Sequence, residues 1–401
     1  YKMMNWWMDR GIDGFRMDVI TQISKVVDAN GKLPGEDGSL IADEPVGPEG
    51  YSSPFPFCSD GPRVDEFLAE MRREVFEGRD GYMNVGEAPG VTPARNEHIT
   101  DPANGELDMM FQFNHVGIDQ SGSKWDTVPF KVTNLRRELA EQQDAVSKVG
   151  WASLFFCNHD QPRVVSRWGD DSTEANRVAS AKAFALLLHM HRGTPYVYQG
   201  EELGMTNAHF TSLDQYRDLE ALNAYRQRVE EAKVQSSESM MDALALIGRD
   251  NARTPMQWDE SRFAGFTDEH APVEPWIGVN PNHATVNAAK QIDDPNSVYA
   301  FYRRLIALRH DNPVVAAGEW QLIDANDEYV YAFTRKLNGT TLLTMVNLSG
   351  NRVAIPADSA ALVASGVSEP QIVISTHGAS HAVVSLANRE LSAWEGIVVE
   401  L

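Results

Sequence analysis

The stretch "GIDGFRMDVI", residues 11–20, places an arginine and an aspartate two positions apart inside an otherwise apolar run. Side chains alternate between the two faces of a β-strand, so Arg16 and Asp18 would point to the same side of a strand over residues 13–18. Burying charge is costly unless the charge is paired or used in chemistry. We therefore expect a buried strand whose end carries a paired, functional set of charges.

Four further runs have the same plan, with apolar residues first and polar or charged residues at the end. They are "YMNVGE" (82–87), "LDMMFQF" (107–113), "SLFFCNHD" (153–160) and "PYVYQGEE" (195–202). Between these strand candidates, apolar residues recur at helical spacing with charges opposite them. Such helices are predicted over residues 64–76, 134–146 and 175–191. Strands that alternate with helices predict a parallel α/β sheet.

The charges of three runs stand at the carboxyl ends of their strands, as Asp18, Glu87 and Asp160. In a (β/α)₈ barrel, active sites are built from this rim. Any one of these carboxylates could instead cap the helix that follows it. Helix capping explains three converging cases poorly, so we interpret the pattern as part of a catalytic barrel.

The character of the chain changes along its length. Residues 203–296 are polar and irregular, and a last barrel-type helix is predicted over residues 297–312. From residue 315 onward, strands alternate with turns, including a hairpin over residues 328–350 with an Asn-Gly turn. We therefore expect a partial catalytic barrel in residues 1–314 and a small antiparallel β domain in residues 315–401.

Composition excludes several classes of function. The formal net charge is −22, which disfavours binding to nucleic acid or to anionic lipid. Cys58 and Cys157 lie in no Cys/His ligand pattern, so no metal site is predicted. No apolar run approaches the roughly 20 residues of a membrane helix. No signal peptide is recognisable, and we expect a cytoplasmic protein.

Three carboxylates on separate strand ends suit glycoside hydrolysis. One attacks the anomeric carbon, and a second with a raised pKa protonates the leaving oxygen. A third can orient sugar hydroxyls and stabilise the positive charge of the transition state. Arg16 would keep Asp18 ionised in such a site.

Several motifs carry a family resemblance. "GFRMDVI", "NVGE" and "FFCNHDQPR" resemble, in order, three signature regions of the α-amylase clan of retaining glycosidases. "RGTPYVYQGEELGMTN", "GRDNARTPMQWD" and "SGSKWD" resemble its oligo-1,6-glucosidase (isomaltase) branch. The resemblance implies exo-acting, retaining hydrolysis of α-glucosidic bonds, with α-1,6 bonds of isomaltose-type oligosaccharides preferred and glucose released from the non-reducing end.

The resemblance also implies roles for single residues. Asp18 matches the nucleophile, Glu87 the acid/base and Asp160 the transition-state stabiliser. His159 matches a ligand of sugar hydroxyls, and Arg16 matches the arginine that supports the nucleophile. Two structural alternatives stay open: Arg16 and Asp18 as a buried ion pair between strands, and His159 as a core histidine.

Three further matches concern specificity. Val19 is similar to the residue found in α-1,6-preferring members, Lys124 to a lysine that contacts the second sugar, and Arg253 to an arginine that grips the non-reducing glucose. Their alternatives are a core valine, an exposed loop lysine and a salt-bridged loop arginine. The resemblance implies small α-glucosides as partners and no organic cofactor, and it leaves the oligomeric state open.

The resemblance places the predicted strands at barrel strands four to eight, so that the first three strands would precede residue 1. A structural calcium ion would then belong to that preceding segment. An open half-barrel would leave bare sheet edges, so we expect the 401 residues alone to be unstable and inactive. The alternatives in function are a broader α-glucosidase acting on maltose, sucrose or a phosphorylated disaccharide, and a non-catalytic, transporter-associated relative.

Overall fold

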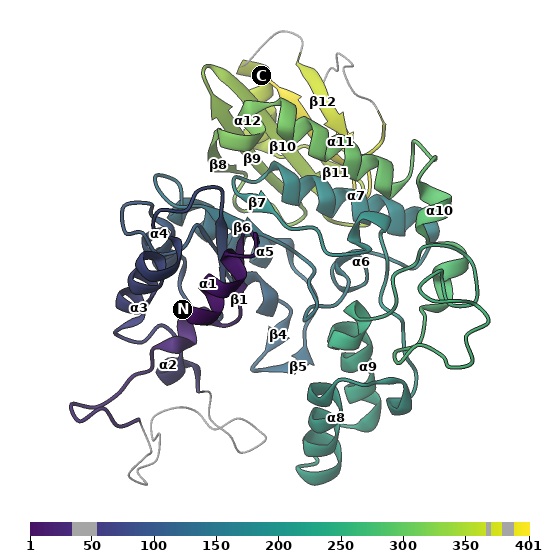
Figure 1. Ribbon diagram of the computed structural model, residues 1–401. Helices are drawn as coiled ribbons and strands as arrows, with labels where there is room; N and C mark the ends of the chain where they lie inside the picture. The colour runs from purple at the N-terminus through teal and green to yellow at the C-terminus, as the bar shows by residue number, and fades with distance from the viewer. Residues whose placement is uncertain (34–53, 366–369, 379–388) are drawn as a thin grey trace. The chain divides into compact units, whose positions relative to one another are not determined.

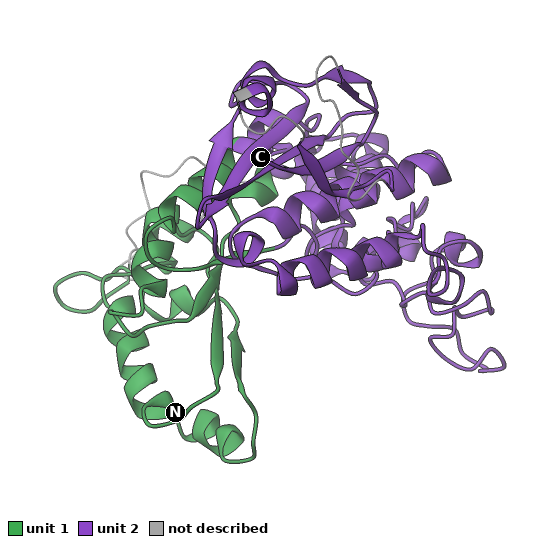
Figure 2. Ribbon diagram, turned by 90° about the horizontal axis from the view of Figure 1, so that it is seen from above, with its two compact units in different colours: residues 1–117, 137–154 green, residues 118–136, 155–401 purple. Residues whose placement is uncertain are grey.

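The computed structural model describes residues 1–33, 54–365, 370–378 and 389–401. Figure 1 labels the helices and strands, and Figure 2 colours two compact units. Unit 1 comprises residues 1–117 and 137–154, and unit 2 comprises residues 118–136 and 155–401. Helix α5 (Val132–Ala145) contains the division between residues 136 and 137. This division differs from the predicted boundary near residue 315, which stays a prediction.

Unit 1 is built on a parallel sheet, as the alternation of strands and helices predicted. Its hydrogen-bonded strands, in spatial order, are β1 (Gly14–Met17), β2 (Met83–Glu87), β3 (Met109–Phe111) and β6 (Ala152–Leu154). Gly14 pairs with Met83, Val85 with Met109, and Met110 with Ala152. The carboxyl ends of these strands therefore point the same way.

A glycine at position 14 is required for the close pairing of β1 with β2. Gly14 has φ +139°, and a Cβ atom there would lie 1.8 Å from the carbonyl oxygen of Met83. Any side chain at this position would push the two strands apart. The residue that opens β1 thus fixes the approach of the strands that carry Arg16 and Glu87.

Helices cover the sheet of unit 1 through one apolar cluster. In α3 (Val64–Met71), Val64, Leu68 and Met71 recur at helical spacing and are buried. They share the cluster with side chains of α1 (Lys2–Met8), β1 and α4 (Pro93–Thr100). A π-helical turn, Arg72–Phe76, continues α3 to the end of the predicted helix. A short helix, α2 (Phe55–Cys58), precedes α3.

Three predicted strands end earlier than their sequences indicated, and the one predicted over residues 107–113 ends at Phe111. The strand predicted over residues 153–160 ends at Leu154, and further along the chain the Asn158 side chain accepts the N–H of Asp160 at 2.7 Å in a turn. The strand predicted over residues 195–202 is reduced to β7 (Thr194–Pro195). Proline lacks an amide hydrogen, and Gly200 begins a 3₁₀ turn with φ +83°.

Unit 2 contains the long helices predicted over residues 175–191 and 297–312, which are α7 (Glu174–Met190) and α11 (Val298–Asp311). Its other helices are α6 (Val164–Arg167), α8 (Leu219–Tyr225), α9 (Ser237–Ile247), α10 (Ala288–Gln291), α12 (Pro313–Ala317) and α13 (Ala357–Ser365). A hairpin of β4 (Gln120–Ser121) and β5 (Ser123–Thr127) packs Trp125 against α8 and α9. The Nζ atom of Lys124 lies 5.0 Å from the centroid of the Trp125 ring.

The carboxyl-terminal part of unit 2 forms the predicted antiparallel sheet. In spatial order its strands are β12 (Gln371–Ser375), β14 (Gly396–Glu400), β10 (Thr340–Asn347), β9 (Val330–Leu337) and β8 (Glu319–Ile323). Strands β9 and β10 join through Asn338 and Gly339, both with positive φ, as an Asn-Gly hairpin requires. A smaller pair joins β11 (Val353–Ala354) to β13 (Glu390–Leu391).

Among the described residues, the helices are all too short or too polar to cross a lipid bilayer.

Candidate active site

Four of the predicted site residues gather at the carboxyl ends of β1 and β2 in unit 1. The Arg16 guanidinium donates to Oδ1 of Asp18 at 2.5 Å and lies 3.0 Å from Oε2 of Glu87. The backbone N–H of Val19 donates to the same oxygen of Glu87 at 3.1 Å. One arginine therefore holds both carboxylates of the predicted catalytic pair.

The environments of the two carboxylates differ. The Glu87 side chain is 10% exposed, whereas that of Asp18 is 74% exposed. Burial raises the pKa of Glu87, and the nearby Asp18 adds to this, although the Val19 N–H and the Arg16 charge act in the opposite direction. Two neighbouring carboxylates in unlike surroundings are what an acid and a nucleophile require.

The expected burial of the Arg16–Asp18 pair is wrong for this structure. Both residues are exposed, and the Arg16 side chain retains 38% of its accessible surface. Met17 packs into the apolar cluster, while its two neighbours face the other side of the sheet and stay exposed there. The pair is therefore not a buried structural ion pair.

Val19 has an unusual backbone conformation. Its φ of 37° and ψ of 42° are left-handed, a region that β-branched residues rarely occupy. The strain turns the chain sharply after Asp18 and directs the Val19 N–H toward Glu87. The prediction of Val19 as a specificity residue did not include this conformation, because no turn motif marks it in the sequence.

The remaining predicted residues lie in unit 2, around Asp160. Arg253 donates to Oδ1 of Asp160 at 2.6 Å and to the carbonyl oxygen of His159 at 2.8 Å. The ring of His159 lies 3.4 Å from the other carboxylate oxygen of Asp160. Asp160 was predicted at the carboxyl end of a strand. The structure differs, because β6 ends at Leu154 and the Asn158 turn lies between the strand and Asp160.

Arg249, which the sequence analysis missed, connects this group to two further carboxylates. It lies 3.3 Å from Asp160 and donates two hydrogen bonds to Asp218, at 2.7 and 2.8 Å. It also lies 3.1 Å from Glu220, which accepts a 2.6 Å hydrogen bond from Lys124. The signal was its position in "GRDNARTPMQWD", four residues before Arg253.

The ion pairs of this network shift the pKa values of two of its members, Asp218 and Lys124. Burial alone would raise the pKa of Asp218, but hydrogen bonds and charge from Arg249 outweigh it and hold the pKa below its usual value. Burial lowers the pKa of Lys124, and Glu220 partly offsets that effect. Lys124 is thus neither a freely exposed lysine nor an isolated one, in contrast to the loop alternative.

The sequence of the chain matches a known protein family over most of its length. The model of the alpha-amylase catalytic domain matches residues 1–318. The chain belongs to the alpha-amylase family. The family match covers both groups of predicted site residues, which come from unit 1 and unit 2.

Curated members of the alpha-amylase family resemble the chain closely. It is 47% identical to an oligo-1,6-glucosidase of Parageobacillus thermoglucosidasius, over 87% of this chain and 59% of the relative. It is 42% identical to a trehalose-6-phosphate hydrolase of Bacillus subtilis, over 88% of this chain and 59% of the relative. The chain thus spans about three fifths of the length of these alpha-amylase family enzymes.

A solved structure has the same fold. The crystal structure of trehalose-6-phosphate hydrolase from Bacillus licheniformis superposes with a TM-score of 0.85 at 38% identity. The match covers 100% of this chain and 67% of the other.

Proposed function

We propose that the protein containing this chain is a retaining, exo-acting α-glucosidase that prefers α-1,6 bonds of isomaltose-type oligosaccharides. The names of the curated relatives support this substrate class. The observation that carries the proposal is the contact of Arg16 with both Asp18 and Glu87, of which only Glu87 is buried. This unequal pair suits two different roles in one reaction.

In the proposed mechanism, Asp18 is the nucleophile. Its exposed carboxylate attacks the anomeric carbon and forms a covalent glucosyl-enzyme. Glu87, whose pKa is raised by burial, gives its proton to the departing glycosidic oxygen. Glu87 then takes a proton from water, which attacks the same carbon and releases glucose with its configuration retained.

We assign supporting roles to residues of unit 2 on the same resemblance. Asp160 stabilises the positive charge of the transition state, while His159 and Arg253 bind hydroxyls of the terminal glucose. Lys124 contacts the second sugar, and in unit 1 Val19 favours the α-1,6 bond. The hydrogen bonds from Arg253 to Asp160 and His159 support a shared function of these three residues.

We further propose that the parallel strands correspond to strands four to eight of a (β/α)₈ barrel, followed by a separate β domain from residue 315. The five-residue and shorter strands with intervening helices support this correspondence. The chemistry needs no organic cofactor. Cytoplasmic location, a calcium ion in a preceding segment, and inactivity of the 401 residues alone stay predictions.

A second candidate is hydrolysis of a phosphorylated disaccharide. The relative from Bacillus subtilis and the solved structure from Bacillus licheniformis both carry the name trehalose-6-phosphate hydrolase, and both match most of this chain. This candidate shares the mechanism above and differs only in the group that occupies the second sugar site. A non-catalytic function is disfavoured because all three predicted carboxylates are present.

The test is a substrate panel on the complete natural polypeptide. Isomaltose, panose, maltose, sucrose, trehalose and trehalose 6-phosphate are compared by kcat/KM, and the first product anomer is read by NMR. The proposal predicts the highest value for isomaltose or panose, with α-glucose formed first. A preference for trehalose 6-phosphate would favour the second candidate, and β-glucose as the first product would overturn the retaining mechanism.

A further inference from the structure

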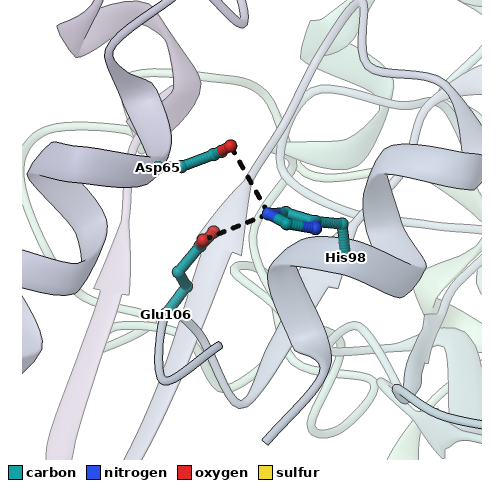
Figure 3. Close-up of side chains that lie close together, drawn as sticks. All are labelled: Asp65, His98 and Glu106. Carbon is teal, nitrogen blue, oxygen red and sulfur yellow. Dashed lines mark ion pairs between the residues drawn. The ribbon is translucent and has the colours of Figure 1, made fainter. Parts of the chain in front are cut away.

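Three further side chains with metal-binding atoms converge in unit 1. Asp65 comes from α3, His98 from α4, and Glu106 from the segment that leads into β3. Figure 3 shows both carboxylates directed at the same ring nitrogen of His98. The sequence analysis predicted no metal site from the pattern of the two cysteines, and these three residues follow no ligand-spacing motif that would have marked them.

The distances between the three ligand atoms fit a small divalent ion. Nε2 of His98 lies 3.4 Å from Oδ2 of Asp65 and 3.5 Å from Oε1 of Glu106. A tetrahedral zinc site with bonds of about 2.0–2.1 Å has ligand atoms about 3.3 Å apart. Two edges of such a tetrahedron are therefore already present, and the three atoms all lie within 4.8 Å of one another.

Glu106 supplies an independent observation. Its side chain is only 4% exposed, and within the part of the chain that the structure describes Oε2 has no hydrogen-bond partner. A buried carboxylate oxygen without a partner is costly. Burial raises the pKa of Glu106 to about 7, and the nearby Asp65 adds to this. The side chain is thus buried in a position where a cation would compensate its charge.

The surrounding charges leave room for that cation. Arg95 is bound to Asp60 at 2.9 Å and also donates to Asp65, so one guanidinium serves two carboxylates. Within the described part of the chain, Arg95 donates its hydrogen bonds to Asp60 and Asp65 and none to Glu106, so the charge of Glu106 comes in addition to theirs. The carboxylates of Asp60, Asp65 and Glu106 outnumber the single guanidinium of Arg95. An added cation would therefore balance charge in this cluster.

We propose that Asp65, His98 and Glu106 bind a divalent transition-metal ion of the zinc type. The imidazole ligand favours such an ion over calcium or magnesium, which prefer oxygen ligands. Binding through Nε2 puts the imidazole proton on Nδ1, which lies 3.3 Å from the Asn104 side-chain amide. In this structure it is the amide nitrogen that faces Nδ1, and it also donates to the His98 carbonyl at 2.7 Å, so metal binding requires the amide to turn its oxygen to the ring and give up that bond.

The ion would have a structural role that is separate from the proposed hydrolysis. It would join α3, α4 and the entry to β3, which otherwise meet through apolar packing and the Arg95 ion pairs. Water would complete its coordination. The site neither contains nor requires Asp18 or Glu87, so failure of this proposal leaves the proposed function untouched.

The test is a zinc titration of the complete natural polypeptide, freed of metal with a chelator. Wild type, His98→Gln and Glu106→Gln are compared by competition with a chromophoric chelator and by thermal unfolding. His98 is 44% exposed, so its replacement should fold. His209→Gln is the matched control, because His209 also faces one carboxylate, Asp171, at 2.9 Å.

We expect one zinc ion per wild-type and His209→Gln chain, with a higher Tm when zinc is added. His98→Gln and Glu106→Gln should weaken binding at least tenfold and lose the rise in Tm. Equal zinc affinity in wild type and His98→Gln would overturn the proposal. The absence of zinc binding to the wild-type protein at about 100 μM zinc would also overturn it. The three side chains would then be held together by hydrogen bonds alone.

Discussion

The backbone N–H of Val19 donates a hydrogen bond of 3.1 Å to the carboxylate of Glu87, which ends the neighbouring strand. Val19 directly follows Asp18, so the main chain beside one carboxylate positions the other. The left-handed conformation of Val19 directs its N–H to this bond. The positions of Glu87 and Asp18, the proposed acid and nucleophile, are therefore linked by this backbone hydrogen bond as well as by Arg16.

Arg16→Gln should shift the alkaline limb of the pH profile. The positive charge of Arg16 lowers the pKa of Glu87, against the larger effect of burial. Without that charge the pKa of Glu87 rises, and the acid stays protonated to higher pH. We expect the alkaline limb of kcat/KM to move upward by about 1 pH unit and kcat to fall about 100-fold.

The matched control for this change is Arg79→Gln. Arg79 pairs with Asp9 at 2.6 Å in the same unit but contacts neither proposed catalytic carboxylate. Its pH profile should match that of wild type. An unmoved alkaline limb in Arg16→Gln, with kcat near the wild-type value, would mean that Arg16 does not control Glu87.

Val19→Thr should change specificity without changing stability. Threonine keeps the β-branched shape and the backbone strain, but its hydroxyl alters the surface beside Asp18. We expect the ratio of kcat/KM for isomaltose over maltose to fall, with Tm unchanged. An unchanged ratio would remove Val19 from the specificity residues.

Val19→Asn separates strain from specificity. Asparagine tolerates the left-handed region, so we expect this variant to be more stable than wild type. Its free energy of unfolding, measured by chemical denaturation, should rise by about 1 kcal/mol. Equal or lower stability would show that the conformation of Val19 carries no strain.

Arg249→Gln should destabilise the protein and weaken substrate binding. The Asp218 side chain is 4% exposed and would lose both of its hydrogen bonds from Arg249. Arg249 is itself 28% exposed, so solvent screens part of the loss, and we expect about 2 kcal/mol in the free energy of unfolding. KM should rise because Asp160 loses one of its two guanidinium partners.

A double-mutant cycle with Asp218→Asn measures the coupling between Arg249 and Asp218. The double variant should lose less than the sum of the two single variants, because the first change already breaks the pair. Additive losses, or a loss below 0.5 kcal/mol in Arg249→Gln, would contradict the assigned network.

Acid should destabilise the protein through His191. Burial lowers the pKa of His191 to about 3, and Arg335 and Arg309 add to this despite its hydrogen bond to the Leu187 carbonyl. The unfolded histidine takes up a proton near pH 6.5, whereas the folded one stays neutral. The stability that the neutral group contributes is therefore present above about pH 6.5 and is lost as pH falls toward 3.

His191→Asn should flatten this dependence between pH 7 and pH 4, as measured by chemical denaturation, even if the variant is less stable at pH 8. His209→Asn is the opposite control. Its hydrogen bond with Asp171 raises the pKa of His209, so His209 contributes stability at low pH. An identical pH slope in wild type and His191→Asn would refute the assignment.

Local sequence patterns predicted much of the fold. Helical spacing located α7 and α11 within about one residue and located α3 together with the π-helical turn that continues it, and the Asn-Gly pair located the turn between β9 and β10. These features depend on contacts between residues close in sequence or on a residue with special backbone freedom. The end of β6 at Leu154 was not predicted, because the apolar run that suggested the strand continues through Cys157.

Only those site residues that lie in recognisable sequence motifs were predicted. Arg16, Asp18 and Glu87 lie together at the ends of β1 and β2, as expected of parallel neighbours that share one rim. Arg249, Asp218 and Glu220 were missed because their pairing joins segments about 30 residues apart. The exposure of Arg16 and Asp18 was missed because alternation fixes the face of a strand but not what covers it.

The most direct test of the account is to identify the residue that carries the covalent sugar. The complete natural polypeptide is incubated with a fluorinated α-glucosyl fluoride, whose glucosyl-enzyme hydrolyses slowly, and its peptides are examined by mass spectrometry. The account predicts one added sugar on the peptide that contains Asp18, and none in Asp18→Asn. A sugar on the Glu87 or Asp160 peptide, or turnover with no covalent species, would contradict it.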